Sequence, residues 1–334
     1  MAQQAITVIK GDGIGPDVID AALSILKKVG CDFRYDYADA GTVAQEKYGE
    51  ILPQQTIDKI AENKIALIGP LTPLVGQSTS INVLLRERFN LYANVRPALS
   101  FKGTTARYQD IDIITVRENT EGMYSGFGQT SAEDGSFAEA TSKITKQGAE
   151  KIVKFAYELA RREGRKKVTA VHKANMLKST SGLFLKVAHQ IGELYPDIES
   201  SEILIDNACM QLVMNPHQFD VLVTTNLFGD ILSDLCAGLV GGLGMTASAN
   251  IGDNCAIFET VHGAAPELSG KNLANPSAAI LASAEMLEYL GAGDKASNIC
   301  RALREVIEHS DRTTRDLGGE SGTAELTQAV IERL

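Results

Sequence analysis

Apolar and polar positions follow two different periods along the chain, and this pattern predicts an α/β protein. Short apolar runs predict strands at 6–10, 33–38, 65–69, 91–97, 111–119, 167–173, 201–206, 220–226 and 256–262. Between them, apolar residues recur at helical spacing at 53–63, 145–164 and 182–196. Alternating strands and helices over 334 residues favour an α/β fold of about two domains.

A glycine-rich turn follows the first predicted strand. The segment "ITVIKGDGIGPDV" places Gly11, Gly13 and Gly15 between a strand pattern and a helix pattern, which is similar to a dinucleotide-binding fingerprint. Pro16 occupies the position where that fingerprint has glycine or alanine, and proline in a first helical turn favours a helix start. The turn therefore predicts either a pyrophosphate cradle or only a tight turn with close backbone contacts.

The segment 127–145 interrupts the α/β alternation. It is polar, with weak alternation, and lies between a predicted strand and a long predicted helix. The pattern is compatible with a protruding hairpin arm and with a plain surface loop.

Composition excludes several classes of partner. The net charge of −10 and a pI near 5.1 argue against binding to nucleic acid or to an anionic membrane. The five widely spaced cysteines form no zinc-type pattern and indicate a reducing compartment. No segment approaches 18 uninterrupted apolar residues, so we expect a cytoplasmic protein, with removal of an organellar presequence as the alternative.

Three aspartates form the first candidate site. Asp230 and Asp234 are four residues apart at the start of a predicted helix, which places both carboxylates on one face. Asp206 ends an earlier predicted strand. Carboxylates without sulfur or imidazole companions suit Mg²⁺ or Mn²⁺. Taken singly, Asp230 is equally compatible with a helix cap and Asp234 with a solvated helix position.

Three arginines form the second candidate site. Arg86, Arg96 and Arg117 lie near predicted element ends, and Ser80 and Asn82 lie at the front of a predicted helix. Guanidinium groups directed to one cleft predict a substrate with several carboxylates. The alternatives are ordinary surface ion pairs for each arginine and a helix cap for Ser80.

Two further residues could move protons. Lys173 directly follows a predicted strand and could act as a base, while the hydroxyl of Tyr124 could donate a proton. The neighbouring His172 falls on the alternate face of the same strand, where we expect a packed core residue.

Taken together, these segments resemble the decarboxylating β-hydroxyacid dehydrogenases, the family of isocitrate, isopropylmalate and homoisocitrate dehydrogenases. The motifs "GDGIGP", "IGPLT", "LYANVRP", "RENTEG", "VHKAN", "NLFGDILSDL", "GLVGGLG", "FETVHGAAP", "NPSAAIL" and "DLGG" occur in family order over nearly the whole chain. The likeness is greatest to the catalytic subunits of NAD-dependent isocitrate dehydrogenases.

The resemblance implies a fold and an assembly. It implies a two-domain fold with a mixed sheet flanked by helices, which is not a Rossmann fold. The large domain would comprise 1–98 and 252–334, and the small domain 99–251. It further implies a homodimer, or a higher oligomer, with a clasp at about 127–145 and active sites that draw residues from both chains.

The resemblance also implies roles for the candidate residues. Arg86, Arg96 and Arg117 would clamp substrate carboxylates, and Asp206, Asp230 and Asp234 would hold Mg²⁺ or Mn²⁺, with Asp206 and Lys173 supplied by the partner subunit. Lys173 would help to take the hydroxyl proton as hydride leaves for the nicotinamide. Tyr124 would protonate the enolate that remains after CO₂ loss.

Ser80 and Asn82 match the pair that binds the distal carboxylate of isocitrate in the isocitrate enzymes of this family. Isopropylmalate would leave these polar groups unpaired, at a cost of roughly 1–3 kcal/mol each. Homoisocitrate, which is one methylene longer than isocitrate, is the substrate that is harder to exclude, because a methylene is worth only about 1–3 kcal/mol of discrimination. A non-catalytic regulatory subunit is the alternative from another functional class.

Cofactor choice follows from Glu267 and Leu268, which stand where NADP-dependent isocitrate enzymes carry a basic residue and a tyrosine. A carboxylate there can accept hydrogen bonds from a ribose 2′-hydroxyl and would repel a 2′-phosphate, so the resemblance implies NAD. The remaining cofactor-side positions are Ile14, His262 and Asn275 near the adenosine, and Thr72, Asn175 and Glu259 near the nicotinamide.

Overall fold

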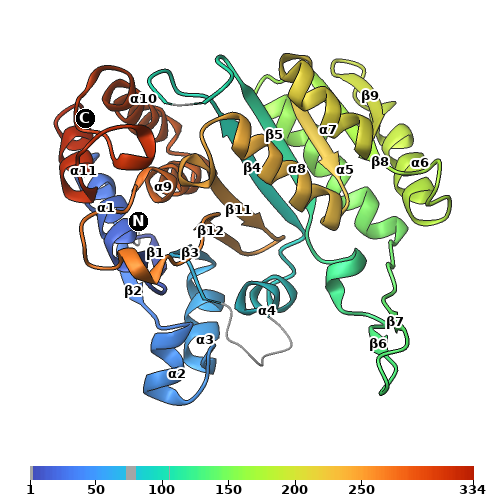
Figure 1. Ribbon diagram of the computed structural model, residues 1–334, viewed down its shortest axis with the longest axis horizontal. Coiled ribbons are helices and arrows are strands. Elements are labelled where there is room, and N and C mark those ends of the chain that lie inside the picture. Colours follow the sequence, from blue (N-terminus) through green and yellow to red (C-terminus); the bar gives the residue numbers. More distant parts are fainter. Residues whose placement is uncertain (1–2, 73–79, 105) are drawn as a thin grey trace. The chain divides into compact units, whose positions relative to one another are not determined.

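The chain divides into two compact units. A computed structural model describes residues 3–72, 80–104 and 106–334 (Figure 1). The first unit comprises 1–89, 99–110 and 237–334, and the second comprises 90–98 and 111–236. The first unit is therefore discontinuous, as the resemblance implied, with bounds that differ from 1–98 and 252–334.

Local packing accounts for these bounds. The segment 99–110 joins the first unit, where Arg304 stacks over the Phe101 ring at 5.7 Å and Gly103 lies against the carbonyl of Ile307. The segment 237–251 joins the first unit because its strand β11 (Ala247–Ile251) pairs antiparallel along its whole length with β12 (Ala256–Thr260). The segment 90–98 belongs with the second unit, where the backbone N–H of Asn119 donates to the Tyr92 carbonyl at 3.0 Å.

The sheet of the first unit is mixed. Its strands are β1 (Ala5–Ile9), β2 (Arg34–Tyr37), β3 (Ile65–Ile68), β11 (Ala247–Ile251) and β12 (Ala256–Thr260), in the order β2-β1-β3-β12-β11. All these pairs are parallel except β11 with β12. The four apolar runs expected in this unit all form strands, and β11 is a strand that the apolar pattern did not predict. The mixed α/β class is confirmed.

The first unit also contains helices. They are α1 (Gly15–Lys28), α2 (Thr42–Tyr48), α3 (Gln54–Asn63), α4 (Ile81–Arg88), α9 (Ser277–Tyr289), α10 (Gly293–His309) and α11 (Thr323–Ile331). The helix α9 packs against α1 and α10 and against strands β11 and β12 (Figure 1). Its small and apolar residues are buried nearly all round, as expected for a helix in the interior of a unit.

The second unit has its own strands and helices. The strands β4 (Ala93–Leu99), β5 (Asp112–Glu118), β10 (Val221–Thr224), β8 (Lys167–His172) and β9 (Glu199–Leu204) lie in this order. The helices are α5 (Lys146–Arg162), α6 (Thr180–Gly192), α7 (Ile205–Met214) and α8 (Asn226–Leu239), the last of which ends in the first unit. The apolar face of α5 packs on β5, β8 and β10 and against α6.

The segment 127–145 contains a hairpin. Strands β6 (Thr130–Ser131) and β7 (Ala138–Glu139) pair antiparallel (Figure 1). Their residues are exposed. Of the two interpretations of this polar segment, the hairpin is therefore confirmed.

All five cysteines are free thiols. Among the described residues, no helix has both the length and the apolar character that crossing a bilayer requires.

Candidate functional site

The predicted site residues divide between the two units. The first unit holds Ile14, Thr72, Ser80, Asn82, Arg86, Glu259, His262, Glu267, Leu268 and Asn275. The second holds Arg96, Arg117, Tyr124, Lys173, Asn175, Asp206, Asp230 and Asp234.

Arg117 is the most deeply buried charge of the second unit. It lies on β5 with only 1% of its surface exposed. Its Nε and Nη2 atoms both donate to Oδ1 of Asn226, at 2.9 and 2.7 Å, and Nη1 donates to Asp230. Gly229 of α8 lies against the arginine stem, where a methyl group would come within 2.5 Å of Cγ. Helix α8 therefore fixes this guanidinium in one position.

Arg96 approaches the same helix from β4. Its Nη1 donates to Ser233 Oγ at 2.8 Å, and lies 3.2 Å from Asp234 Oδ1 and 3.7 Å from Asp230 Oδ1. Asp230 and Asp234 thus share one face of α8, as their spacing predicts. Because Asp230 lies inside the helix and not at its start, the helix-cap alternative for it is wrong.

Tyr124 completes this cluster. Its hydroxyl donates to Asp230 Oδ2 at 3.1 Å, and its ring lies 5.6 Å from the Arg117 guanidinium carbon. Partial burial and the nearby Asp230 carboxylate raise the pKa of Tyr124 above its ordinary value. The hydroxyl is therefore held protonated and can act as a proton donor.

Asp206 and Lys173 form a separate pair. Lys173, directly after β8, donates from Nζ to Asp206 Oδ1 at 2.6 Å, and this hydrogen bond lowers the pKa of the carboxyl. Asp206 was expected at a strand end but lies in the first turn of α7, because β9 ends at Leu204. Within the described part of one chain, no cluster of three metal-ligating side chains forms. One chain therefore brings Asp230 and Asp234 together and leaves Asp206 with Lys173.

His172 is a packed residue, as the strand pattern predicts. It is 5% exposed, and its Nδ1 accepts a hydrogen bond from the backbone N–H of Ala174 at 3.0 Å. Burial lowers the pKa of this imidazole. The neutral ring thus stabilises the turn that carries Lys173 and the exposed Asn175.

In the first unit, Ser80, Asn82 and Arg86 lie on or next to α4. Ser80 is the N-cap, with its hydroxyl accepting from the N–H of Val83 at 3.3 Å, so its structural role as a cap is confirmed. Asn82 and Arg86 are four residues apart and share a helix face. Arg86 Nη2 lies 3.8 Å from Glu259 Oε1, and both side chains are largely buried.

The segment that follows β12 contributes a second cluster of polar residues to the first unit, around His262. Its Nδ1 lies 3.0 Å from the carbonyl oxygen of Gly263, and Nε2 is buried without a hydrogen-bond partner among the described residues. Burial lowers the pKa of this imidazole. Asn275 donates to Asp316 Oδ2 at 2.8 Å, and the Asp316 carboxylate acts on His262 electrostatically. Glu267 and Leu268 follow on a short 3-10 turn, where Glu267 is exposed.

Three backbone N–H groups of the glycine-rich turn are already paired with carbonyl oxygens of the protein. Asp12 donates from its backbone to the Pro70 carbonyl at 2.7 Å, Ile14 to that of Ala264 at 2.8 Å, and Gly15 to that of Asp12 at 2.8 Å. A pyrophosphate cradle needs such groups unpaired. The close-contact alternative is thus the one that the geometry supports, and Pro16 lies in the first turn of α1 as expected.

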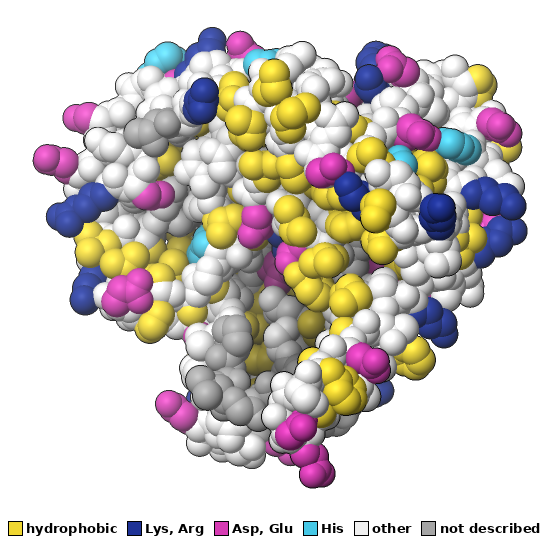
Figure 2. Space-filling model, turned by 45° about the vertical axis from the view of Figure 1, so that its right-hand side comes forward, with side chains coloured by type: hydrophobic (Ala, Val, Ile, Leu, Met, Phe, Trp, Pro, Cys, Tyr) yellow, Lys and Arg dark blue, Asp and Glu magenta, His cyan; other side chains and the backbone are white. Residues whose placement is uncertain are grey.

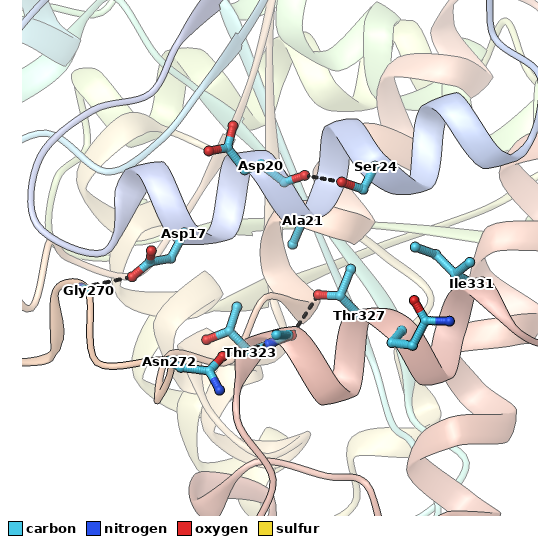
Figure 3. A pocket seen from close by; sticks show the side chains of 11 residues that line it. Asp17, Asp20, Ala21, Ser24, Gly270, Asn272, Thr323, Thr327 and Ile331 are labelled. Atoms are coloured by element: carbon cyan, nitrogen blue, oxygen red, sulfur yellow. Dashed lines mark hydrogen bonds between the residues drawn. The ribbon is translucent and has the colours of Figure 1, made fainter.

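The cavity drawn in Figure 3 contains none of the predicted site residues. It has a volume of about 420 Å³ and lies between α1, α11 and the loop at Gly270 and Asn272. Most of the polar groups drawn there are already paired within the chain, such as Asp17 with the N–H of Gly270. It is therefore not the candidate site.

Some residues that hold the site were not predicted from the sequence. Asn226, Ser233, Asn250 and Asp316 contact Arg117, Arg96, Glu259 and Asn275 respectively. Asn226 and Ser233 belong to "NLFGDILSDL" and Asp316 to "DLGG". These motifs were the available signal, but the partners of Asn226, Ser233 and Asp316 are distant in sequence.

Comparison with known proteins agrees with the motif order. Residues 5–330 match the family model described as isocitrate/isopropylmalate dehydrogenase. The 3-isopropylmalate dehydrogenase of Archaeoglobus fulgidus is 46% identical over 330 residues, covering 98% of this chain and 99% of that protein. Mitochondrial catalytic subunit 5 of the NAD isocitrate dehydrogenase of Arabidopsis thaliana is 43% identical over 330 residues, covering 98% and 88%. The crystal structure of isocitrate dehydrogenase from Methylococcus capsulatus superposes with a TM-score of 0.95 at 51% identity, covering 99% of each chain.

Proposed function

The chain belongs to the isocitrate/isopropylmalate dehydrogenase family, and from this premise we propose that it catalyses NAD-dependent oxidative decarboxylation of isocitrate. The products would be 2-oxoglutarate, CO₂ and NADH, with Mg²⁺ or Mn²⁺ required. One observation carries the choice of substrate within the family, and it is the polar face of α4.

The exposed N-cap Ser80 and the half-buried Asn82 and Arg86 stand where an isopropylmalate enzyme needs apolar contacts. An isopropyl group that covered the hydroxyl or the amide without pairing it would cost about 1–3 kcal/mol for each group. A distal carboxylate of isocitrate would instead accept hydrogen bonds from Ser80 and Asn82. The name of the archaeal relative favours isopropylmalate, but overall identity averages over the chain and does not weigh these positions.

The remaining arginines support a substrate with several carboxylates. Arg96 and Arg117 are held by Ser233 and Asn226 with their guanidinium groups against two aspartates. In this proposal, Arg86, Arg96 and Arg117 bind and orient the carboxylates of isocitrate. A prearranged guanidinium loses little conformational entropy when it binds a carboxylate.

The residues of α8 fit a divalent cation. Asp230 and Asp234 supply oxygen ligands from one helix face, and their side chains are 35% and 57% exposed, so both can be reached. We assign Asp206 of a partner subunit as a further ligand, since Asp206 of the same chain pairs with Lys173. When bound, the metal would act as a Lewis acid toward the substrate oxygens.

Two side chains would handle protons. Lys173 of the partner subunit would help to remove the proton of the substrate hydroxyl as hydride leaves for NAD. Tyr124, whose hydroxyl is held protonated beside Asp230, would donate to the carbon that loses CO₂.

The first unit fits an NAD molecule. The buried Nε2 atom of His262 has no partner among the described residues, and an acceptor there suits the amino group of an adenine. Glu267 supports NAD over NADP because an exposed carboxylate repels a 2′-phosphate. Ile14 and Asn275 would lie on the adenosine side, and Thr72 and Glu259 on the nicotinamide side, where the second unit would add Asn175.

Exposed hydrophobic side chains support a homodimer. Figure 2 shows such side chains over the right-hand part of the molecule. The exposed hydrophobic side chains of the second unit include Met176, Leu177, Met210, Val213, Met214 and Ile231, each at least 43% exposed. Exposed apolar surface of this extent is typical of protein interfaces. We propose that two chains pair through this surface, with the hairpin at 127–145 as a clasp.

The decisive experiment measures kcat/KM for isocitrate, homoisocitrate and isopropylmalate, each with NAD and with NADP, on the purified chain with Mn²⁺. We expect isocitrate with NAD to have the highest value. A higher value for homoisocitrate or isopropylmalate would overturn the substrate. Inactivity on all three without a partner protein would favour a regulatory subunit.

A further inference from the structure

The glycine-rich turn contains a buried carboxylate with no role in the proposed reaction. Asp12 is 4% exposed, and no lysine, arginine or histidine within 4 Å pairs with it in the described part of the chain. A buried charge without a counter-ion must be compensated by hydrogen bonds. The groups that donate hydrogen bonds to Asp12 therefore indicate which segments the turn holds in place.

The two carboxylate oxygens bind different segments. Oδ1 accepts from the backbone N–H of Thr42 at 3.0 Å and from its hydroxyl at 2.5 Å, at the start of α2. Oδ2 accepts from the backbone N–H of Thr72 at 2.7 Å. Thr72 is the position assigned to the nicotinamide side of the cofactor. One oxygen thus holds a helix, and the other holds a cofactor-side residue.

The backbone of the same turn holds the other cofactor-side segment. Ile14 donates to the Ala264 carbonyl at 2.8 Å, and Ser269 donates to the Gly13 carbonyl at 2.8 Å. A methyl group at Gly13, where φ is +56°, would lie 2.0 Å from the Ala264 oxygen. Glycine is therefore required here for close contact with the protein's own backbone.

We propose that Asp12 is a positioning residue for cofactor binding, which sets Thr72 through Oδ2 while the turn sets the segment 262–270. The inference rests on the proposed function for the identity of the cofactor. The glycine-rich turn thus serves dinucleotide binding without contacting a phosphate.

The two oxygens allow a matched pair of variants. Asp12→Ala removes both acceptor oxygens and with them the contact to Thr72, whereas Thr42→Val removes only one bond, to Oδ1. We expect Asp12→Ala to raise the Kd of NADH about tenfold, the equivalent of one hydrogen bond. Its KM for NAD should rise while its KM for isocitrate stays unchanged. Thr42→Val should lower Tm with an unchanged Kd.

NADH fluorescence titration measures binding without turnover, after circular dichroism has shown that each variant is folded. Equal Kd values for wild type and Asp12→Ala, or an equal rise in Thr42→Val, would overturn the positioning role. Absence of NADH binding by the wild type would instead overturn the proposed function. Amide exchange of the wild type without cofactor is a second measurement that needs no variant. A slowly exchanging Thr72 N–H is expected, and rapid exchange would contradict the contact to Asp12.

Discussion

Replacing Gly229 by alanine is predicted to destabilise the protein, although alanine is the better helix former. In an ordinary helix interior this change stabilises by about 1 kcal/mol. Here the added methyl group would lie 2.5 Å from Cγ and 2.6 Å from Cβ of Arg117. Carbon atoms prefer separations of about 3.5–4.0 Å. The stem of a fully buried arginine must therefore move by about 1 Å to relieve this overlap.

The cost can be estimated from the contacts of Arg117. Overpacking a core costs about 1–3 kcal/mol. A displaced guanidinium also weakens its bonds to Asn226 and Asp230, and each bond to a charged group contributes about 1.5–3 kcal/mol. After subtraction of the helix-propensity gain, we expect a loss of about 2–4 kcal/mol in the free energy of unfolding. Because a shift of about 1 Å can cost about 100-fold in rate, kcat/KM for isocitrate should fall by about 10–100-fold.

Gly238 of the same helix is the matched control. A methyl group at Gly238 would meet nothing within 4 Å, so Gly238→Ala should stabilise by up to about 1 kcal/mol without changing kcat/KM. Urea denaturation and initial rates with isocitrate test both variants. If Gly229→Ala were as stable and as active as Gly238→Ala, Arg117 would not be fixed by packing against α8.

Three further predictions concern specificity and pH. Ser80→Val combined with Asn82→Leu should raise the ratio of kcat/KM for isopropylmalate to that for isocitrate by about 10–100-fold, since two polar groups no longer require partners. Glu267→Lys combined with Leu268→Tyr should move preference toward NADP, measured as the ratio of kcat/KM values for the two cofactors. Burial lowers the pKa of His262 below its ordinary value of 6.5, so the stability that its neutral form contributes is complete above pH 6.5 and decreases as pH falls below it. His262→Gln should therefore weaken the dependence of the urea midpoint on pH between 7 and about 5.

Each of these predictions has an outcome that contradicts it. An unchanged substrate ratio would mean that α4 does not select the substrate, and an unchanged cofactor ratio would place that selection outside the Glu267 turn. For the pH effect, His309→Gln is the control because His309 is exposed. If both histidine variants altered the pH dependence equally, burial of His262 would not be its cause.

The apolar pattern predicted the strands well because a buried strand shows its character in consecutive residues. All nine expected runs contain a strand, whereas β11 was missed. Its sequence "ASANI" is small and partly polar, yet every residue is buried, because Asn250 donates to Glu259 on the neighbouring strand at 2.6 Å. A polar residue whose burial depends on a partner in another strand looks like a loop residue in a single sequence.

The same limit applies to the candidate site. Spacing alone placed Asp230 and Asp234 on one helix face, because both lie within two turns of one helix. It could not show that Asn226 accepts two hydrogen bonds from Arg117, more than 100 residues away. Nor could it show that Asp206 lies in the first turn of α7, where Lys173 is its partner within the chain.

The charges on α8 suggest why the proposed substrate and metal would bind together. Within the second unit, the guanidinium groups of Arg96 and Arg117 are balanced by the carboxylates of Asp230 and Asp234. A divalent cation alone would add positive charge beside two arginines, and a tricarboxylate alone would add negative charge beside two aspartates. When both enter, the arginines can exchange aspartate oxygens for substrate carboxylates while the aspartates turn to the metal. Each ligand then compensates the charge that the other displaces, so each should bind more tightly in the presence of the other.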